Sequence, residues 1–463
     1  MSAPTDVPPR GDTAVRLLHT SDWHLGVTIR GEPRSADHDA LIDEIVAIAR
    51  SASPDLILHT GDLFDTARPP MAEFGRAIRA LRALATVAPV VLLAGNHDSA
   101  ATLDVLGLAL ADTEPVQMDP LVATEHRIRV LSRPLPAESG AVATYATRAG
   151  GRLRVAALPF VHQNRLIRDF DEIVEANATY NDSLRKIISR YRDVAFADFD
   201  PTVDVAVFAS HVHIRDAKTS TEKTIHIADD YATDPAHFDS RFGYLAFGHI
   251  HVPQAVAAGR GRYAGSILEV DFGEEGEGKQ VVVVDLEPGR PASIVPIELR
   301  AGRRIRRVRV PLSALPAEVD ALGDSIVEVA ITAELDDDGS PLPAGPIVIN
   351  DHEFDMLSAA VAAVLPDATV VSVIDARTPF GALADLPEPE AATSLSDAFR
   401  GWLGSAAARQ SLSLPATVGA DPARVAEMFD ECHAAVLLDN TVEFAEIAQL
   451  AAFDAEPSSR TAD

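Results

Sequence analysis

The sequence predicts an α/β fold, with a sheet sandwich or doubly wound core flanked by helices, followed by a small α+β unit and C-terminal helices. The first observation is that short apolar runs alternate with helix-period segments between residues 15 and about 290. The second is a separate strand–helix–strand–helix–strand pattern from Arg300 to Asp375. The third is composition, since 463 residues with 47% hydrophobic content suffice for about two to four domains with buried cores.

Apolar runs predict buried strands in the first part of the chain. Each is short, rich in Val, Leu or Ala, and followed by Gly or polar residues, as expected of strands inside an α/β layer. The runs are VRLLHT (15–20), DLILHT (55–60), VVLLAG (90–95), LRVAALPF (153–160), DVAVFAS (204–210) and YLAFGH (244–249). Apolar residues at helical spacing predict helices between them at 38–52, 71–86 and 183–196.

The predicted domains follow from these patterns. Residues 1–14 are expected to be a disordered N-terminus, and 15–299 the main α/β domain. Strands and helices at 300–380 predict a compact α+β domain. Prolines and acids at 381–393 break any periodicity and predict a linker. Amphipathic helices are expected at 394–453 and a disordered tail at 454–463.

Charge and cysteine content restrict the class of protein. The net charge of −29 argues against broad electrostatic attraction to nucleic acid. The single cysteine, Cys432, excludes an intrachain disulfide framework and fits a reducing compartment. No uncharged apolar run reaches the roughly 18 residues of a membrane span, and the N-terminus lacks the pattern of a secretory signal. The expected location is therefore the cytoplasm, with no membrane partner.

Side chains that can bind metal follow five of the predicted strands. Functional groups gather beyond the carboxyl ends of strands in open α/β layers. Residues two apart in an extended chain point to the same side, so Asp22 and His24 can converge on one object. Glycines at 61, 95 and 248 would let the backbone approach a shared centre. The candidates are Asp22, His24, Asp62, Asp65, Asn96, His97, His211, His213, His249 and His251.

This donor set predicts a site for two divalent ions. Oxygen and imidazole donors without thiolate suit Mn²⁺, Fe²⁺ or Zn²⁺ better than a structural zinc site. Asp62 could bridge two ions about 3.5–4 Å apart, an arrangement used in phosphoryl chemistry. Either His211 or His213 could be the ligand, and His211 is favoured because it directly follows the apolar run. His19 and His59 are expected to pack at strand ends rather than bind metal.

The order of these motifs resembles the calcineurin-like metallophosphoesterases. D-x-H, G-D-x-x-D, G-N-H-D, a strand-end His and G-H-x-H occur in that order. TSDWHLG, GDLFD, GNHDS, LAFGHIH and YAGSILEVDFGE resemble the SbcD-type nuclease subunits of bacterial SbcC–SbcD complexes. The resemblance covers roughly residues 15 to 285 and implies a four-layer β-sandwich flanked by helices. It also implies that the small α+β domain is a capping, DNA-recognition domain.

The resemblance also implies a role for each site residue. One metal would be held by Asp22, His24, Asp62 and His251, and the other by Asp62, Asn96, His211 and His249. His97 would act as the general acid or stabilise the transition state. Asp65 would keep His97 protonated, because a nearby carboxylate favours the imidazolium. Manganese is the expected metal.

The activity implied by the resemblance is hydrolysis of DNA phosphodiesters in repair and recombination. It comprises exonuclease action on double-stranded ends and endonuclease action on single strands or hairpins. The expected partners are DNA and an SbcC-type ATPase, with this chain as a homodimer within a heterotetramer that associates with the nucleoid. The amphipathic helices at 394–453 would dock on the ATPase. The alternatives are a phosphatase or phosphodiesterase for small molecules or cyclic nucleotides, and a catalytically silent scaffold.

Two parts of the chain each allow two interpretations. The segment Arg300 to Arg309 holds six arginines, which either contact DNA or compensate an acidic surface. The helices at 71–85 and 101–112 either form a dimer bundle or pack in the core of their own chain. Their apolar positions are Phe74, Ile78, Leu81, Leu103, Leu106 and Leu110.

Overall fold

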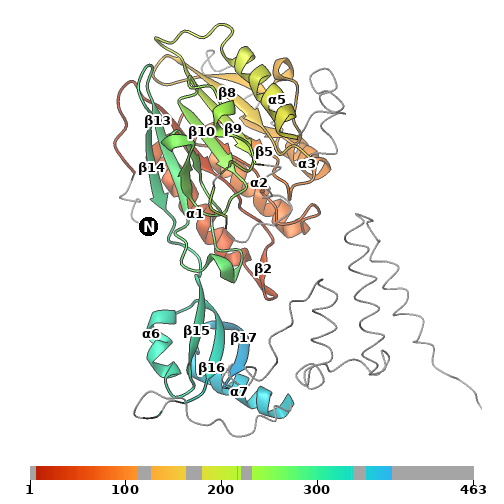
Figure 1. Ribbon diagram of the computed structural model, residues 1–463, viewed down its shortest axis with the longest axis vertical. Coiled ribbons are helices and arrows are strands. Elements are labelled where there is room, and N and C mark those ends of the chain that lie inside the picture. Colours follow the sequence, from red (N-terminus) through yellow and green to blue (C-terminus); the bar gives the residue numbers. More distant parts are fainter. Residues whose placement is uncertain are drawn as a thin grey trace, which may run out of the picture. The chain divides into compact units, whose positions relative to one another are not determined.

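The structure is a computed structural model that describes residues 7–111, 127–162, 180–215, 217–219, 232–334, 336 and 351–377. The predicted linker, C-terminal helices and tail lie outside the described residues. In the described part, two six-stranded sheets form the main body and a three-stranded sheet forms a smaller one (Figure 1). No helix of this part combines the length and apolar character needed to cross a membrane.

The first sheet contains the strands that precede the first three motifs. Its strand order is β14–β13–β1–β4–β5–β6. β1, β4, β5 and β6 run parallel, whereas β13 pairs antiparallel with β1 and matches Leu17 with Val284. The bounds are β1 (Val15–Thr20), β4 (Leu56–His59), β5 (Val90–Leu93), β6 (Ile128–Leu131), β13 (Gln280–Leu286) and β14 (Ser293–Glu298). Its helices are α1 (Ser35–Ala52), α2 (Met71–Ala85) and α3 (Ala100–Leu110).

The second sheet contains the strands that precede the histidine motifs. Its strand order is β11–β12–β10–β9–β8–β7. β8, β9, β10 and β12 run parallel, and β7 and β11 are antiparallel strands at the edges. The bounds are β7 (Val142–Ala146), β8 (Arg152–Leu158), β9 (Val205–His211), β10 (Tyr244–Gly248), β11 (Gln254–Val256) and β12 (Gly261–Tyr263). Helix α5 (Tyr180–Ala195) covers its outer face (Figure 1).

Alternation of side chains along the strands builds four layers. On β1, Leu17 belongs to the core between the sheets, and Leu18 belongs to the core under the first-sheet helices. On β9, Val207 faces the first sheet and Phe208 faces α5. Because successive side chains of a strand point to opposite faces, one uninterrupted apolar run supplies two cores. The predicted four-layer sandwich flanked by helices is confirmed.

The six apolar runs that predict strands all form strands, with ends that shift by a few residues at most. The three predicted helices are α1, α2 and α5. The prediction did not single out β13, although its sequence QVVVVDL is apolar throughout most of its length. That apolar run was the available signal for a strand, whereas the pairing of β13 with β1 joins residues far apart in the chain and leaves no local pattern.

The small sheet has the order β15–β16–β17. Its strands are β15 (Ile305–Pro311), β16 (Ile326–Thr332) and β17 (Thr369–Ala376), and its helices are α6 (Val319–Leu322) and α7 (Asp351–Val364). Val308, Val329 and Val361 lie in its core. The order strand–helix–strand–helix–strand is the one that the sequence predicts for residues 300–375. The short elements are β2 (Thr28–Ile29), β3 (Glu32–Pro33), η1 (Ala137–Ser139), η5 (Pro235–His237), η6 (Ala257–Gly259), η7 (Phe272–Glu274) and η8 (Leu315–Glu318).

Helices α2 and α3 bury the apolar residues that were candidates for a dimer surface. Leu81, Leu103 and Leu106 are fully buried in the core under the first sheet. Leu110, Phe74 and Ile78 pack into or against that same core. Core packing therefore accounts for Leu81, Leu103, Leu106 and Leu110, whereas Phe74 and Ile78 are only partly buried. The exposed apolar side chains of the two helices are Met71, Val105 and Leu108.

Two glycines allow the loops after β4 and β5 to approach the centre of the molecule. A Cβ atom on Gly95 would lie 2.6 Å from Cγ of Asp62, and one on Gly61 would lie 2.8 Å from Cγ of His211. Gly61 also has a φ of +111°, which side chains rarely allow. The expected role of these glycines, close backbone approach, is confirmed.

Replacing Gly95 by alanine should destabilise the protein by about 1–3 kcal/mol, because the added methyl group displaces Asp62. Thermal unfolding of the Gly95→Ala variant measures this effect. Gly278→Ala is the matched control, since Gly278 is exposed and a Cβ there would meet no atom within 4 Å. Equal melting temperatures for the two variants would contradict the prediction.

Candidate metal centre

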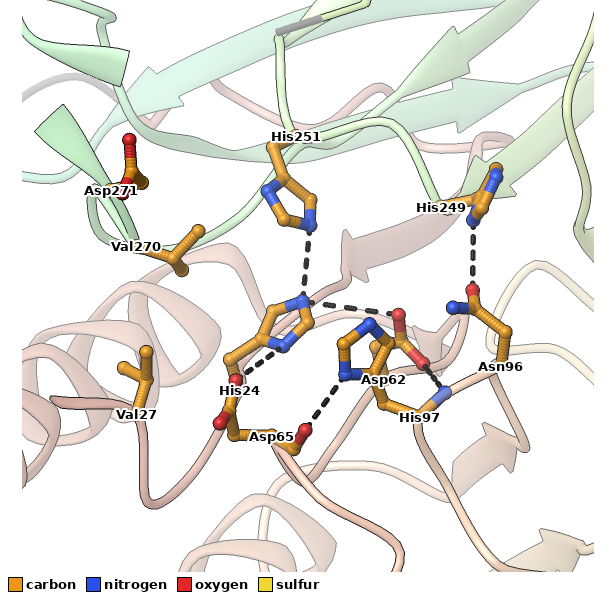
Figure 2. Close-up of a pocket in the computed structure, with 10 residues that line it drawn as sticks. All are labelled: His24, Val27, Asp62, Asp65, Asn96, His97, His249, His251, Val270 and Asp271. Atoms are coloured by element: carbon orange, nitrogen blue, oxygen red, sulfur yellow. Dashed lines mark hydrogen bonds and ion pairs between the residues drawn. The ribbon is translucent and has the colours of Figure 1, made fainter. Parts of the chain in front are cut away.

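The carboxyl ends of five parallel strands from both sheets meet at one site. β1, β4 and β5 come from the first sheet, and β9 and β10 from the second. A cavity of about 450 Å³ opens there and is shown in Figure 2. The structure brings together all nine residues predicted to bind metal or act in catalysis, which are Asp22, His24, Asp62, Asp65, Asn96, His97, His211, His249 and His251.

Several of these residues adopt the left-handed backbone conformation. The φ angles are +50° at Asp22, +47° at His24, +50° at Asp62 and +103° at His249. Asp22 and His24 thus converge in a tight turn after β1, and the expectation of an extended chain at this point is wrong. Such conformations cost about 1–3 kcal/mol each. Hydrogen bonds between the loops help to hold these conformations. The N–H of Asp22 donates to the carbonyl oxygen of Gly61 (2.9 Å), and the N–H of His24 donates to the carbonyl oxygen of Asp62 (3.1 Å).

The carboxylates and imidazoles form overlapping clusters. Asp22, His24 and His251 offer ligand atoms within 4.8 Å of one another. So do Asp22, Asp62 and His211, and also His24, Asp62 and His97. Because Asp22, His24 and Asp62 each belong to two clusters, the three clusters form one continuous centre. Figure 2 shows His24 between His251 and Asp62.

Asn96 completes the side of the centre that faces the second sheet. Its Oδ1 atom lies 2.9 Å from Nε2 of His211 and 2.8 Å from Nδ1 of His249. Nε2 of His211 is also 3.4 Å from Oδ2 of Asp62. His213 is buried but belongs to none of the clusters found among the described residues. His211 thus contacts both Asp62 and Asn96, whereas the ring of His213 lies 6.5 Å from that of His249 between centroids.

The buried carboxylates of the centre favour positive charge next to them. Burial alone would lower the pKa of His24, but a hydrogen bond to Asp65 and the charges of Asp62 and Asp22 outweigh burial and raise it to about 9. The carboxylate of Asp62 likewise overcomes burial and raises the pKa of His211 to about 9. The carboxylates thus stabilise positive charge among them. Carboxylate, amide and imidazole donors without thiolate fit divalent metal ions.

The motifs and this geometry agree with comparisons to known proteins. A family model described as calcineurin-like phosphoesterase matches residues 15–253. The chain belongs to the calcineurin-like phosphoesterase family. The predicted enzyme class, a hydrolase of phosphoester bonds, is thereby confirmed.

The curated relatives of this phosphoesterase include SbcD subunits of the SbcCD nuclease. The SbcD subunit of Bacillus subtilis is 29% identical over 304 residues, which cover 62% of this chain and 71% of that protein. The same subunit of Rhodobacter capsulatus is 28% identical over 319 residues, covering 66% and 72%. That of Escherichia coli K12 is 26% identical over 338 residues, covering 70% and 78%. The predicted resemblance to SbcD-type subunits is confirmed.

The contact between His97 and Asp65 in this phosphoesterase differs from the expected one. Nδ1 of His97 lies 2.7 Å from the main-chain carbonyl oxygen of Asp65. The carboxylate of Asp65 instead lies 3.4 Å from Nδ1 of His24. A carbonyl oxygen only accepts, so Nδ1 of His97 carries the proton. The main-chain N–H of His97 donates to Oδ1 of Asp62 at 2.8 Å.

His19 and His59 pack beneath the centre, as expected. His19 is fully buried, and its ring nitrogens lie 2.9 Å from Oη of Tyr244 and 3.0 Å from Oγ1 of Thr60. Burial lowers the pKa of both histidines to about 3. The carbonyl oxygen of Thr60 lies 2.8 Å from Nδ1 of His211. Thr60 thus supports the ring of His211, His19 contacts Thr60, and His59 packs against Trp23 at 5.0 Å between ring centroids.

Sequence analysis missed Asp98, which joins two loops of the centre. Its carboxylate accepts the main-chain N–H groups of Leu63, Phe64 and Gly95 at 3.0–3.2 Å. Burial and the charge of Asp62 raise the pKa of Asp98 to about 6. Asp98 is the last residue of the G-N-H-D motif, and this position was the signal by which the sequence could have identified it.

Sequence analysis also missed Glu274, which lies behind His251. Oε1 of Glu274 is 2.7 Å from Nδ1 of His251, and Oε2 is 2.7 Å from Nζ of Lys279. Both side chains of the pair formed by Glu274 and Lys279 are fully buried. Burial opposes ionisation of Glu274, but the hydrogen bond from His251 and the charge of Lys279 outweigh it and hold the pKa of Glu274 well below its usual range. The carboxylate thus fixes the proton on Nδ1 and leaves Nε2 of His251 facing His24.

The Glu274→Gln variant should bind Mn²⁺ about 10- to 100-fold more weakly, because a carboxylate behind a metal-binding imidazole orients the ring and raises its basicity. Isothermal titration calorimetry of the purified protein measures the affinity. Glu277→Gln is the matched control, since the Glu277 carboxylate also contacts Nζ of Lys279 (2.8 Å). Equal losses of affinity in the two variants would show that the charge around Lys279 matters and the contact to His251 does not.

Proposed function

We propose that this chain is a metal-dependent DNA nuclease that hydrolyses phosphodiesters and works with an SbcC-type ATPase. One observation carries the proposal: carboxylates, an amide and imidazoles from five strand ends converge on one cavity, in a chain whose relatives are nuclease subunits. Phosphoesterase chemistry follows from the family. DNA as the substrate follows from the similarity to the SbcD-type subunits.

The proposed metal ligands fall into two sets that share Asp62. Asp22, His24, Asp62 and His251 would hold one ion, and Asp62, Asn96, His211 and His249 the other. The clustering of Asp22, His24 and His251 supports the first set, and the contacts of Asn96 with His211 and His249 support the second. When bound, the two ions would supply an activated water and neutralise charge on the phosphate. The oxygen-rich donor set supports Mn²⁺.

His97 is the proposed proton donor to the leaving oxygen. It lines the cavity beside Asp62, and its Nδ1 proton is donated to the carbonyl of Asp65. Its remaining nitrogen, Nε2, is then the atom that can deliver a proton. Asp65 is thus proposed to assist His97 by holding its ring through the main-chain carbonyl oxygen.

Binding of DNA by so acidic a chain requires local positive charge or a partner. Four arginines of the segment Arg300–Arg309 already have acidic partners: Arg303 with Glu32 (2.9 Å) and Asp37 (3.0 Å), Arg307 with Glu328 (3.2 Å), Arg300 with Glu298 (3.5 Å) and Arg304 with Glu269 (3.8 Å). Arg306 and Arg309 have no acidic partner among the described residues. Arg309 is exposed, whereas Arg306 is half-buried and lies on the opposite face of β15, together with the core residue Val308. We assign contact with the DNA backbone to Arg309 and most of the DNA affinity to the ATPase.

The proposed assembly is a homodimer within a heterotetramer that acts on DNA in the cytoplasm, at the nucleoid. Similarity to subunits named as part of an SbcCD nuclease supports the ATPase partner. Exposed Met71, Val105 and Leu108 on α2 and α3 supply an apolar surface for the dimer. The C-terminal segment 394–453 is the proposed docking element for the ATPase.

His97→Ala should retain Mn²⁺ affinity while cleavage falls by about 10²- to 10⁴-fold, the usual loss when a proton-transfer group is removed. The assay compares linear duplex DNA with a small chromogenic phosphodiester, each with Mn²⁺. His237→Ala, on η5, is the control and should cleave normally. Hydrolysis of only the small diester by the unsubstituted protein, with and without the ATPase, would favour a small-molecule phosphodiesterase instead.

Removing residues 394–463 should abolish co-purification with an SbcC-type ATPase, because the deletion removes the proposed docking helices. Hydrolysis of the chromogenic diester should persist, since every residue of the centre lies before residue 275. Undiminished binding of the ATPase by the truncated chain would contradict the docking role of this segment.

A further inference from the structure

A second cavity adjoins the metal centre on the far side of His97. This side cavity has a volume of about 260 Å³, and its lining includes His97, Arg133, Phe160 and His162. Asn96 and His97 line both this cavity and the one at the metal centre. A group bound beside His97 at the metal centre therefore lies next to the side cavity.

The position of His97 decides which part of a substrate would enter the side cavity. A general acid must lie within about 2.6–3.2 Å of the oxygen that it protonates. In hydrolysis of a phosphodiester, that oxygen belongs to the leaving alcohol. The rest of the leaving group consequently lies on the side of His97, and the side cavity is the space next to it.

The lining of the side cavity suits a nucleobase. The ring of Phe160 packs near the rings of His211 (6.0 Å between centroids) and His249 (6.1 Å), and the ring of His162 meets it edge-on at 4.9 Å. Phe160 is thus held between residues of the metal centre and His162. Base–aromatic stacking is the common, sequence-tolerant way to bind single-stranded nucleic acid. Arg133, which also lines the cavity, is paired with Asp104.

We propose that the side cavity binds the leaving nucleoside of the scissile phosphodiester, with its base against Phe160. This inference rests on the proposed nuclease function and names the part of the substrate that the site recognises. Recognition at this point would make the enzyme favour nucleic acid over simple diesters. Because stacking accepts every base, it would add no sequence preference.

The test uses oligothymidylates with one cleavable phosphodiester, whose leaving nucleoside is either thymidine or an abasic deoxyribose. The leaving oxygen is the same in both, so only the base differs. The unsubstituted protein should cleave the thymidine form with a kcat/KM about 5- to 150-fold higher, the factor that corresponds to stacking of one base. In Phe160→Leu, which keeps apolar bulk but loses the aromatic face, this ratio should fall to about one, and Phe160→Trp should restore it.

The measured quantity is the ratio of kcat/KM for the thymidine form to kcat/KM for the abasic form. A general disturbance of the metal centre lowers both values equally and leaves this ratio unchanged, whereas loss of base recognition lowers the ratio. A matched control places the abasic nucleoside on the other side of the phosphate, where Phe160→Leu should leave the ratio unchanged. A ratio near one in the unsubstituted protein, or one that survives Phe160→Leu, would overturn the proposal. Failure of the unsubstituted protein to cleave any DNA with or without the ATPase would overturn the nuclease function itself, and this inference with it.

Discussion

The close approach of loops from two facing sheets is the constraint on which the metal centre depends. Gly95 lies against Asp62, and Gly61 lies against His211, with no room for a side chain at either glycine. Left-handed backbone at Asp22 and Asp62 adds strain of about 1–3 kcal/mol per residue. The buried cores on both faces of each sheet hold the strand ends in place, so this strain persists in the native state. The rigid scaffold thus gives the centre its precision.

The imidazoles of the centre are oriented by acceptors behind them. His251 has the carboxylate of Glu274, His211 has the carbonyl of Thr60, and His97 has the carbonyl of Asp65. Each acceptor fixes a proton on one ring nitrogen and thereby decides which nitrogen faces the cavity. Glu274 is the one charged acceptor of these three, and its carboxylate holds the His251 ring in place. The donor set is therefore arranged before any ligand arrives, which avoids the cost of reorganisation when charge develops.

Substrate choice must come from the surroundings of the centre, because its donors suit any phosphodiester. The side cavity contributes an aromatic wall at Phe160. The small sheet joins the main domain through a cluster that contains Phe272, Ile305 and Ile326. Ion pairs of Arg303 with Glu32 and Asp37 strengthen this junction. Arg303 and Arg304 of the arginine-rich segment thus pair with acidic residues of the main domain.

Apolar runs predict the strands and a layered α/β class because each run is a local pattern, and the motifs at the strand ends indicate the candidate ligands. The sequence by itself did not reveal that β13 pairs with β1, or that Asp22 and His24 lie in left-handed turns. Only the tertiary structure placed Glu274 behind His251 and buried the dimer candidates of α2 and α3 in their own core. These features arise from contacts between residues far apart in the chain, and a local sequence pattern does not specify the partner of a long-range contact.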